Sequence, residues 1–168
     1  MPTPATRQLI SIVMSMRNIT QKKLGEPDIL FSGLEIWISG RQFPESTDYW
    51  DANWLTVTAH CASKGSQVWV KGPILHLSEI QHWLSRLKQL YKTIEGETEL
   101  PCMEPELNVN VSLNKLGHGS LVVSIIPDHL SEHHEFTFEV DQSFLPAVIK
   151  NLEDVLNRYP IKGDEEKT

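Results

Sequence analysis

The chain has 168 residues, of which 40% are hydrophobic and 22% are charged, and its formal net charge is −7. This length and composition indicate a single globular domain and exclude a disordered chain. The acidic balance disfavours direct binding to nucleic acid, because phosphates repel it, and no apolar run reaches the roughly 18–20 residues that span a bilayer.

The first 27 residues differ in character from the rest of the chain. They contain two early prolines and show weak hydrophobic periodicity, and the segment up to Lys23 holds four basic residues and no acid. We predict that residues 1–27 form an N-terminal extension, either disordered or a marginal helix. Residues 28–161 are predicted to form one domain, and the charged residues 162–168 a disordered tail.

Three β-strands are predicted next. Leu34–Ser39 and Asn53–Ala62 alternate between apolar and polar residues, and Ser66–Lys71 is rich in β-formers. The pair Lys64-Gly65 is typical of a hairpin turn between the last two.

A helix is predicted to follow, from Ser78 to Gly96. Ser78 is a suitable N-cap, and Gln81, three residues later, completes a capping box. The apolar residues of this segment recur at spacings of three and four, so they form one stripe: Ile80, Trp83, Leu84, Leu87, Leu90, Tyr91 and Ile94.

Further strands are predicted at Leu107–Leu113, Ser120–Ile126 and Glu135–Val140, with a short strand near Thr98–Met103 as a fourth. A second amphipathic helix then begins near Ser143, since Pro146 is compatible only with a first turn, and it stops before Pro160.

This order of elements predicts an α+β fold. Strand runs joined by short turns pair antiparallel, and each helix has one apolar stripe to bury. We expect an antiparallel sheet of about six to seven strands with two amphipathic helices on one face, in the order three strands, helix, three or four strands, helix. The other face of the sheet is then solvated or a binding surface.

No catalytic, cofactor or metal motif emerges from the residues. The cluster of His129, His133, His134 and Glu135 resembles a metal site in composition, but adjacent residues of a strand point to opposite faces, and we interpret the cluster as a solvated loop. His60 and Cys61 are separated by the same rule. Cys61 and Cys102 are too few for a disulfide scaffold, and we interpret them as reduced thiols of a cytoplasmic chain.

An unusual aromatic segment runs from Asp48 through Tyr49, Trp50 and Asp51 to Trp54. Tyrosine and tryptophan are enriched at interaction hot spots, so the segment is a candidate partner contact. The alternative is that the rings pack the loop and the core while Asp48 and Asp51 cap turns.

Several stretches of the chain resemble one protein family. Between about residues 34 and 160 they are similar to the WapI-type bacterial immunity proteins, in particular Ile36–Pro44, Asp48–Leu55, Glu104-Pro105, Asp141–Leu145 and Tyr159-Pro160. The resemblance implies a small non-enzymatic cytoplasmic protein that binds and neutralises the toxin domain made beside it, often a nuclease.

Charge suits such a role. Residues 93–141 hold ten acids and one base, which favours a basic partner. The predicted partner-binding residues combine the aromatic segment with the acids expected to be exposed: Asp48, Tyr49, Trp50, Asp51, Glu97, Glu99, Glu104, Glu106, Asp128, Glu132 and Glu135. Two alternatives stay open: an enzyme or small-ligand binder with a pocket lined by His60, Asp48 or Asp51, and a protein that self-associates through its uncovered sheet face.

Overall fold

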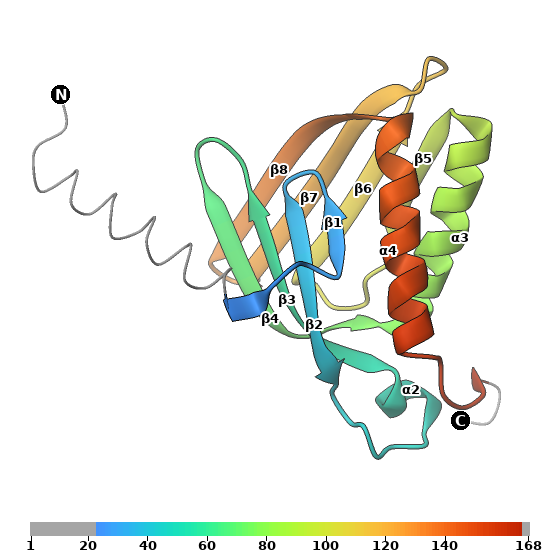
Figure 1. Ribbon diagram of the computed structural model, residues 1–168. Coiled ribbons are helices and arrows are strands. Elements are labelled where there is room, and N and C mark those ends of the chain that lie inside the picture. Colours follow the sequence, from blue (N-terminus) through green and yellow to red (C-terminus); the bar gives the residue numbers. More distant parts are fainter. Residues whose placement is uncertain (1–22, 166–168) are drawn as a thin grey trace, which may run out of the picture.

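The computed structural model describes residues 23–165 and contains two four-stranded antiparallel sheets (Figure 1). In each sheet the strands are neighbours in chain order. The first sheet contains β1 (Ile29–Phe31), β2 (Leu34–Arg41), β3 (Trp54–Ala62) and β4 (Gln67–His76), and the second contains β5 (Gly96–Leu100), β6 (Leu107–Leu113), β7 (His118–Asp128) and β8 (Glu132–Asp141).

Two long helices lie side by side, α3 (Leu77–Thr93) and α4 (Leu145–Arg158), as Figure 1 shows. α3 connects the first sheet to the second and packs against β5, while α4 packs against α3 and β1. A one-turn helix, α2 (Tyr49–Ala52), interrupts the connection between β2 and β3, and a 3-10 turn, η1 (Gln142–Phe144), precedes α4.

The predicted α+β class, the antiparallel pairing and the two long helices are confirmed, but the strands do not form one sheet of six or seven. β4 does not pair with β5, because the chain leaves β4 directly into the 17-residue helix α3 and returns in a separate sheet. Alternation of apolar and polar residues predicts where strands occur. It does not predict whether two strands that are joined by a helix pair with each other.

Most strands differ from their predicted bounds, and two of the differences affect the edges of the first sheet. β1 was not predicted, since it has only three residues, and it pairs with β2 through a turn in which Ser32 has a φ of 54°. β4 runs past Gly72 and Pro73 to His76, and the register of its pairing with β3 shifts at this point. A proline is tolerated in such an edge strand at an irregularity of the ladder.

The caps of both helices also differ from the predicted ones. α3 begins at Leu77, so its N-cap is His76 rather than Ser78: the His76 N–H donates to Glu79 Oε2 (2.8 Å) and the Ser78 N–H donates to His76 Nδ1 (3.3 Å). At η1, Asp141 Oδ1 accepts from the Ser143 N–H (2.8 Å). Pro146 lies in the first turn of α4, as predicted.

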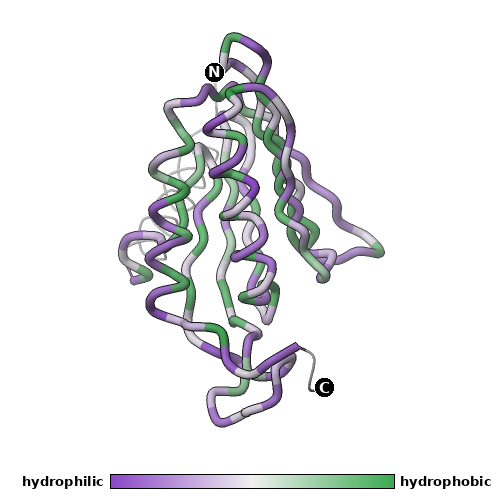
Figure 2. The backbone as a smooth tube through the Cα atoms, turned by 90° about the vertical axis from the view of Figure 1, so that its right-hand side faces the viewer, coloured by the Kyte–Doolittle hydropathy of each residue, from purple (hydrophilic) through white to green (hydrophobic). Residues whose placement is uncertain are grey.

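The core lies between the two sheets and the helices. Hydrophobic and hydrophilic residues alternate along the strands (Figure 2), and the apolar side chains of both sheets and both helices belong to one buried cluster. The sheets approach closely at Gly33: a Cβ built there would lie 2.3 Å from the Ala62 carbonyl oxygen and 2.5 Å from Cζ of Phe138 on β8. The division into two sheets therefore leaves each sheet one apolar inner face and one outer face.

Candidate protein-binding surface

The outer face of the second sheet is polar and acidic. Side chains of a strand alternate between the two faces, and the inward set of each strand is apolar and buried. The outward side chains define what we call the acidic face: Glu97, Glu99, Asn108, Asn110, Ser112, Ser120, Val122, Ser124, Ile126, Glu135, Thr137 and Glu139.

No lysine or arginine offsets this charge within the sheet. The strands β5 to β8 contain no lysine or arginine, and Glu97 and Glu99 lie on one edge strand while Glu135 and Glu139 lie on the other. The Asn110 side chain donates to Glu97 Oε1 (2.7 Å), and Arg86 of α3 borders the groove beside Glu97 and Glu99. A face with such an excess of carboxylates raises the local concentration of cationic ligands and repels anionic ones.

Two acidic loops lie at one end of this sheet. Because neighbouring strands are antiparallel, the β5–β6 loop with Glu104 and Glu106 and the β7–β8 turn with Asp128 and Glu132 leave the sheet at the same end. Asp128 and Glu132 are exposed, whereas Glu104 and Glu106 are half-buried. Asp128 also shapes its turn: its Oδ1 accepts from the Leu130 N–H (2.9 Å), a bond that lowers the pKa of the carboxyl group.

The aromatic segment belongs to the first sheet and is separate from the acidic face. Asp48 is the N-cap of α2, where its Oδ1 accepts from the N–H groups of Trp50 (2.9 Å) and Asp51 (3.0 Å). Tyr49 is buried, Asp51 is exposed, and Trp50 is 39% exposed. Trp50 and Asp51 are therefore the members of the segment that present substantial surface to a partner.

The rings of this segment surround a buried histidine, His76. The ring centroids of Tyr49, Trp50 and Trp54 lie 5.6, 5.3 and 5.2 Å from that of His76. His76 Nδ1 accepts from the Ser78 N–H, which can only donate, so the ring proton is on Nε2, where it faces the Trp50 carbonyl oxygen at 3.2 Å. Burial lowers the pKa of His76, because it disfavours the charged imidazolium.

A buried carboxylate links this cluster to the β5–β6 loop. Glu79 Oε2 accepts from the His76 N–H (2.8 Å) and Oε1 accepts from the Met103 N–H (2.6 Å). Burial raises the pKa of Glu79, and the two amide hydrogen bonds act in the opposite direction. The chain of contacts from Trp50 through His76 and Glu79 to Met103 holds α2 and the β5–β6 loop in fixed positions.

Asn53, which the sequence did not single out, is the most densely bonded side chain of the segment. It is fully buried, and its Nδ2 donates to the carbonyl oxygens of Tyr49 (2.7 Å) and Lys162 (2.8 Å). Its Oδ1 accepts from the Lys162 N–H (2.9 Å) and from Arg41 Nη1 (3.1 Å). Arg41 also donates to the carbonyl oxygens of Ala52 and Pro160. Asn53 and Arg41 thus fix the segment that follows α4 to the first sheet.

His60 and Cys61 face opposite sides of β3, as predicted. Cys61 belongs to the core, whereas the His60 ring stacks on Trp69 (centroids 3.9 Å apart) with Nδ1 2.7 Å from Glu35 Oε2. Both cysteines are free thiols. Burial raises the pKa of Cys61 to about 12 and raises that of Cys102 as well, so neither is a thiolate near neutral pH.

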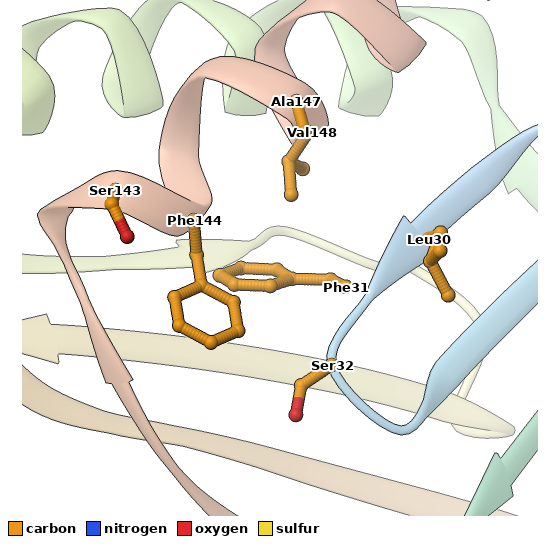
Figure 3. A pocket seen from close by; sticks show the side chains of 7 residues that line it. All are labelled: Leu30, Phe31, Ser32, Ser143, Phe144, Ala147 and Val148. Carbon is orange, nitrogen blue, oxygen red and sulfur yellow. The ribbon is translucent and has the colours of Figure 1, made fainter.

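An apolar groove opens between the β1–β2 turn and the start of α4 (Figure 3). It measures about 410 Å³, and its walls are Leu30, Phe31, Ser32, Ser143, Phe144, Ala147 and Val148. These walls contain no titratable group. His60, Asp48 and Asp51 line neither this groove nor the two smaller ones beside Arg86, so no catalytic pocket of the expected composition is formed there.

The described residues, 23–165, include no group of three or more histidine, cysteine, aspartate or glutamate side chains placed to hold a metal ion. Within residues 23–165, no helix has both the length and the apolar character needed to cross a membrane.

One acid of the acidic face, Glu139, was not among the predicted contact residues. Glu139 follows Glu135 by four residues, and residues an even number apart in a strand lie on the same face of the sheet. The alternation of apolar and polar residues in β8 could therefore have predicted that Glu139 is exposed.

Taken together, the fold and its surface define a class: a two-sheet α+β domain with an acidic outer face and buried polar residues that hold its loops. Within that class, the chain belongs to the immunity protein WapI-like family, whose model matches residues 28–160. No curated protein matches the sequence. Among solved structures, the chain is similar to the plant transcriptional regulator PBF-2, with 11% identity, a TM-score of 0.44, and coverage of 82% of this chain and 90% of that one.

Proposed function

We propose that this chain is a non-enzymatic cytoplasmic immunity protein that binds a cognate toxin domain and blocks it through the acidic face. Membership of the WapI-like immunity family carries the proposal. The negative charge of the face indicates that such a toxin presents a basic surface. Nucleases, which bind phosphate, have surfaces of this kind. The more specific form of this hypothesis is that the toxin domain is a nuclease.

The acidic face suits such a partner in two ways. Its excess of carboxylates steers a basic protein into an encounter, which raises the association rate most at low salt. Their spread over both edges of the sheet, with uncharged Asn, Ser and Thr side chains between them, leaves a central area that forms hydrogen bonds without a large desolvation cost. We further propose Trp50 as an anchor, and Asp48, Asp51, Glu104, Glu106, Asp128 and Glu132 as contributors to the same acidic potential. Tyr49, which the sequence also suggested as an anchor, is buried against His76 and is not available to a partner.

The test is the association of the full chain with the toxin domain encoded beside it. A triple variant, Glu97→Gln, Glu99→Gln and Glu135→Gln, removes three charges from the acidic face. A matched variant, Glu26→Gln, Glu45→Gln and Glu165→Gln, removes three exposed charges elsewhere. We expect the association rate of the first variant to fall by about tenfold or more at low salt, and that of the second to change by less than about twofold.

Salt provides the second readout. The association rate of the unmodified chain is expected to fall as salt rises, and the triple variant of the face to lose most of that dependence. Equal effects of the two variants would refute the acidic face as the binding surface. Failure of the toxin domain to bind the unmodified chain, together with failure of the chain to protect cells that express the toxin, would refute the immunity function itself.

A further inference from the structure

β8 leaves one edge of the second sheet open. Among the strands that the structure describes, it pairs with β7 alone, and its main neighbours are β7 and η1. Within residues 23–165, no hydrogen bond joins the backbone of Glu135–Val140 to any group outside the β7–β8 ladder. In Figure 1 this strand forms the border of the second sheet on the side away from β5.

The hydrogen-bond pattern shows which amides face that edge. The Gln142 N–H donates to the Gly117 carbonyl oxygen (2.8 Å), in line with the pairing of Val140 with Gly119. Hydrogen-bonded residues alternate along an antiparallel strand, so the even-numbered residues of β8 bond to β7. The backbone N–H and C=O groups of Glu135, Thr137 and Glu139 therefore point to the open edge.

The other sheet edges are obstructed. β1 has three residues, lies against α4, and donates its Leu30 N–H to Asn151 Oδ1 (3.1 Å). β4 carries Gly72 and Pro73 at a shift of register, and β5 lies against α3. β8 spans ten residues without glycine or proline. Such a strand is a template for the addition of another one unless its side chains prevent it.

The side chains beside these open amides determine what kind of strand can pair with β8. Glu135, Thr137 and Glu139 are exposed and project onto the acidic face. In a pair of β8 strands centred on Thr137, Glu135 would lie opposite Glu139 of the second copy, and like charges directly opposite one another are destabilising. An added strand with lysine or arginine on this side would instead place cations opposite both carboxylates. The charges therefore disfavour a second copy and favour a basic strand.

We propose that β8 binds an extended basic segment of the partner protein, which joins the second sheet as a fifth strand beside Glu135, Thr137 and Glu139. The proposal rests on the proposed function, in that the natural source of the segment is the toxin domain. The backbone groups supply affinity, and the two carboxylates select lysine or arginine at alternate positions. The edge thereby extends the acidic face rather than forming a separate site.

The experiment uses the full isotope-labelled chain and a synthetic nine-residue peptide of alternating lysine and valine, observed by NMR. We expect saturable shifts centred on the amides of Glu135, Thr137 and Glu139, with slower hydrogen exchange at these three. A peptide with glutamate in place of lysine tests the charge. A lysine peptide that is N-methylated at alternate residues tests the ladder, because it lacks the donors for it.

Thr137→Pro is the matching variant of the protein. The Thr137 N–H points outward, so proline removes a donor at the edge without breaking the β7–β8 ladder. We expect peptide binding to weaken about tenfold, while Thr137→Val, which keeps the amide, binds as the unmodified chain does. Circular dichroism and the melting temperature show whether Thr137→Pro is folded, and the peptide controls stand without that variant.

Three results would overturn the proposal: no shift at the edge amides at millimolar peptide, equal binding of the N-methylated peptide, or protection of the edge amides that rises with protein concentration in the absence of peptide. The third would identify a second copy as the occupant. Peptide binding, with neither binding of the toxin domain nor protection of cells that express the toxin, would refute the proposed function and leave the edge site intact. If Thr137→Pro does not weaken toxin binding, the edge site is refuted and the proposed function stands.

Discussion

Removal of the Asn53 side chain is the sharpest test of how the aromatic segment is held. Asn53→Ala deletes four hydrogen bonds, two donated to the carbonyl oxygens of Tyr49 and Lys162 and two accepted from Lys162 and Arg41. The site is fully buried, so water does not replace the lost partners without rearrangement. At about 1 kcal/mol for each bond, and more where a buried group stays unpaired, we expect a loss of about 3–5 kcal/mol in the free energy of unfolding.

Urea unfolding followed by tryptophan fluorescence measures this loss, because Trp50 and Trp54 lie in the same segment. The matched control is Asn108→Ala, which makes the same chemical change at an exposed position of β6 and is expected to cost less than about 0.5 kcal/mol. A loss below about 1 kcal/mol for Asn53→Ala would refute the reasoning, since it would mean that the bonded groups find equivalent partners in its absence.

Three further predictions follow from the burial and packing of single residues. Burial lowers the pKa of His76 below its ordinary 6.5, so its contribution to stability is complete above pH 6.5 and is lost as the pH falls through the folded-state pKa; denaturant titrations from pH 8 to 5 should show this decline, and His76→Asn should flatten it. Gly33→Ala is expected to destabilise by more than about 2 kcal/mol, because a Cβ there meets backbone and the Phe138 ring, whereas Gly65→Ala has open space and should change the melting temperature little. Cys61, with a pKa of about 12, should react with thiol reagents at pH 7.5 only after unfolding, and rapid labelling of the native chain would show that β3 opens readily.

The acidic-face variants of the proposed function also separate binding from stability. Glu97, Glu99 and Glu135 are exposed, so their replacement by glutamine should leave the free energy of unfolding within about 0.5 kcal/mol. A large change in stability would indicate that these carboxylates hold the sheet together, and the association data of that variant could not then be assigned to the face.

Local patterns in the sequence determined much of this protein. Alternation at Leu107–Leu113 and Glu135–Val140, and spacings of three and four in α3 and α4, predicted strands and helices because the side chain's position relative to the core depends on the local period alone. The same alternation separated His60 from Cys61, and the acidic character of Glu97, Glu99 and Glu135 alone predicted their exposure.

Only the tertiary structure decided which strands share a sheet, which groups bond inside the aromatic segment, and which edge is open. The pairing of β5 with β6 rather than with β4 depends on how α3 crosses the core, and the partners of Asn53 come from Lys162, 109 residues away. Such contacts join segments that are distant in the chain, so no local period encodes them. The open edge of β8 is likewise a property of the assembled sheets, since a strand is an edge only when every other strand has found its partner.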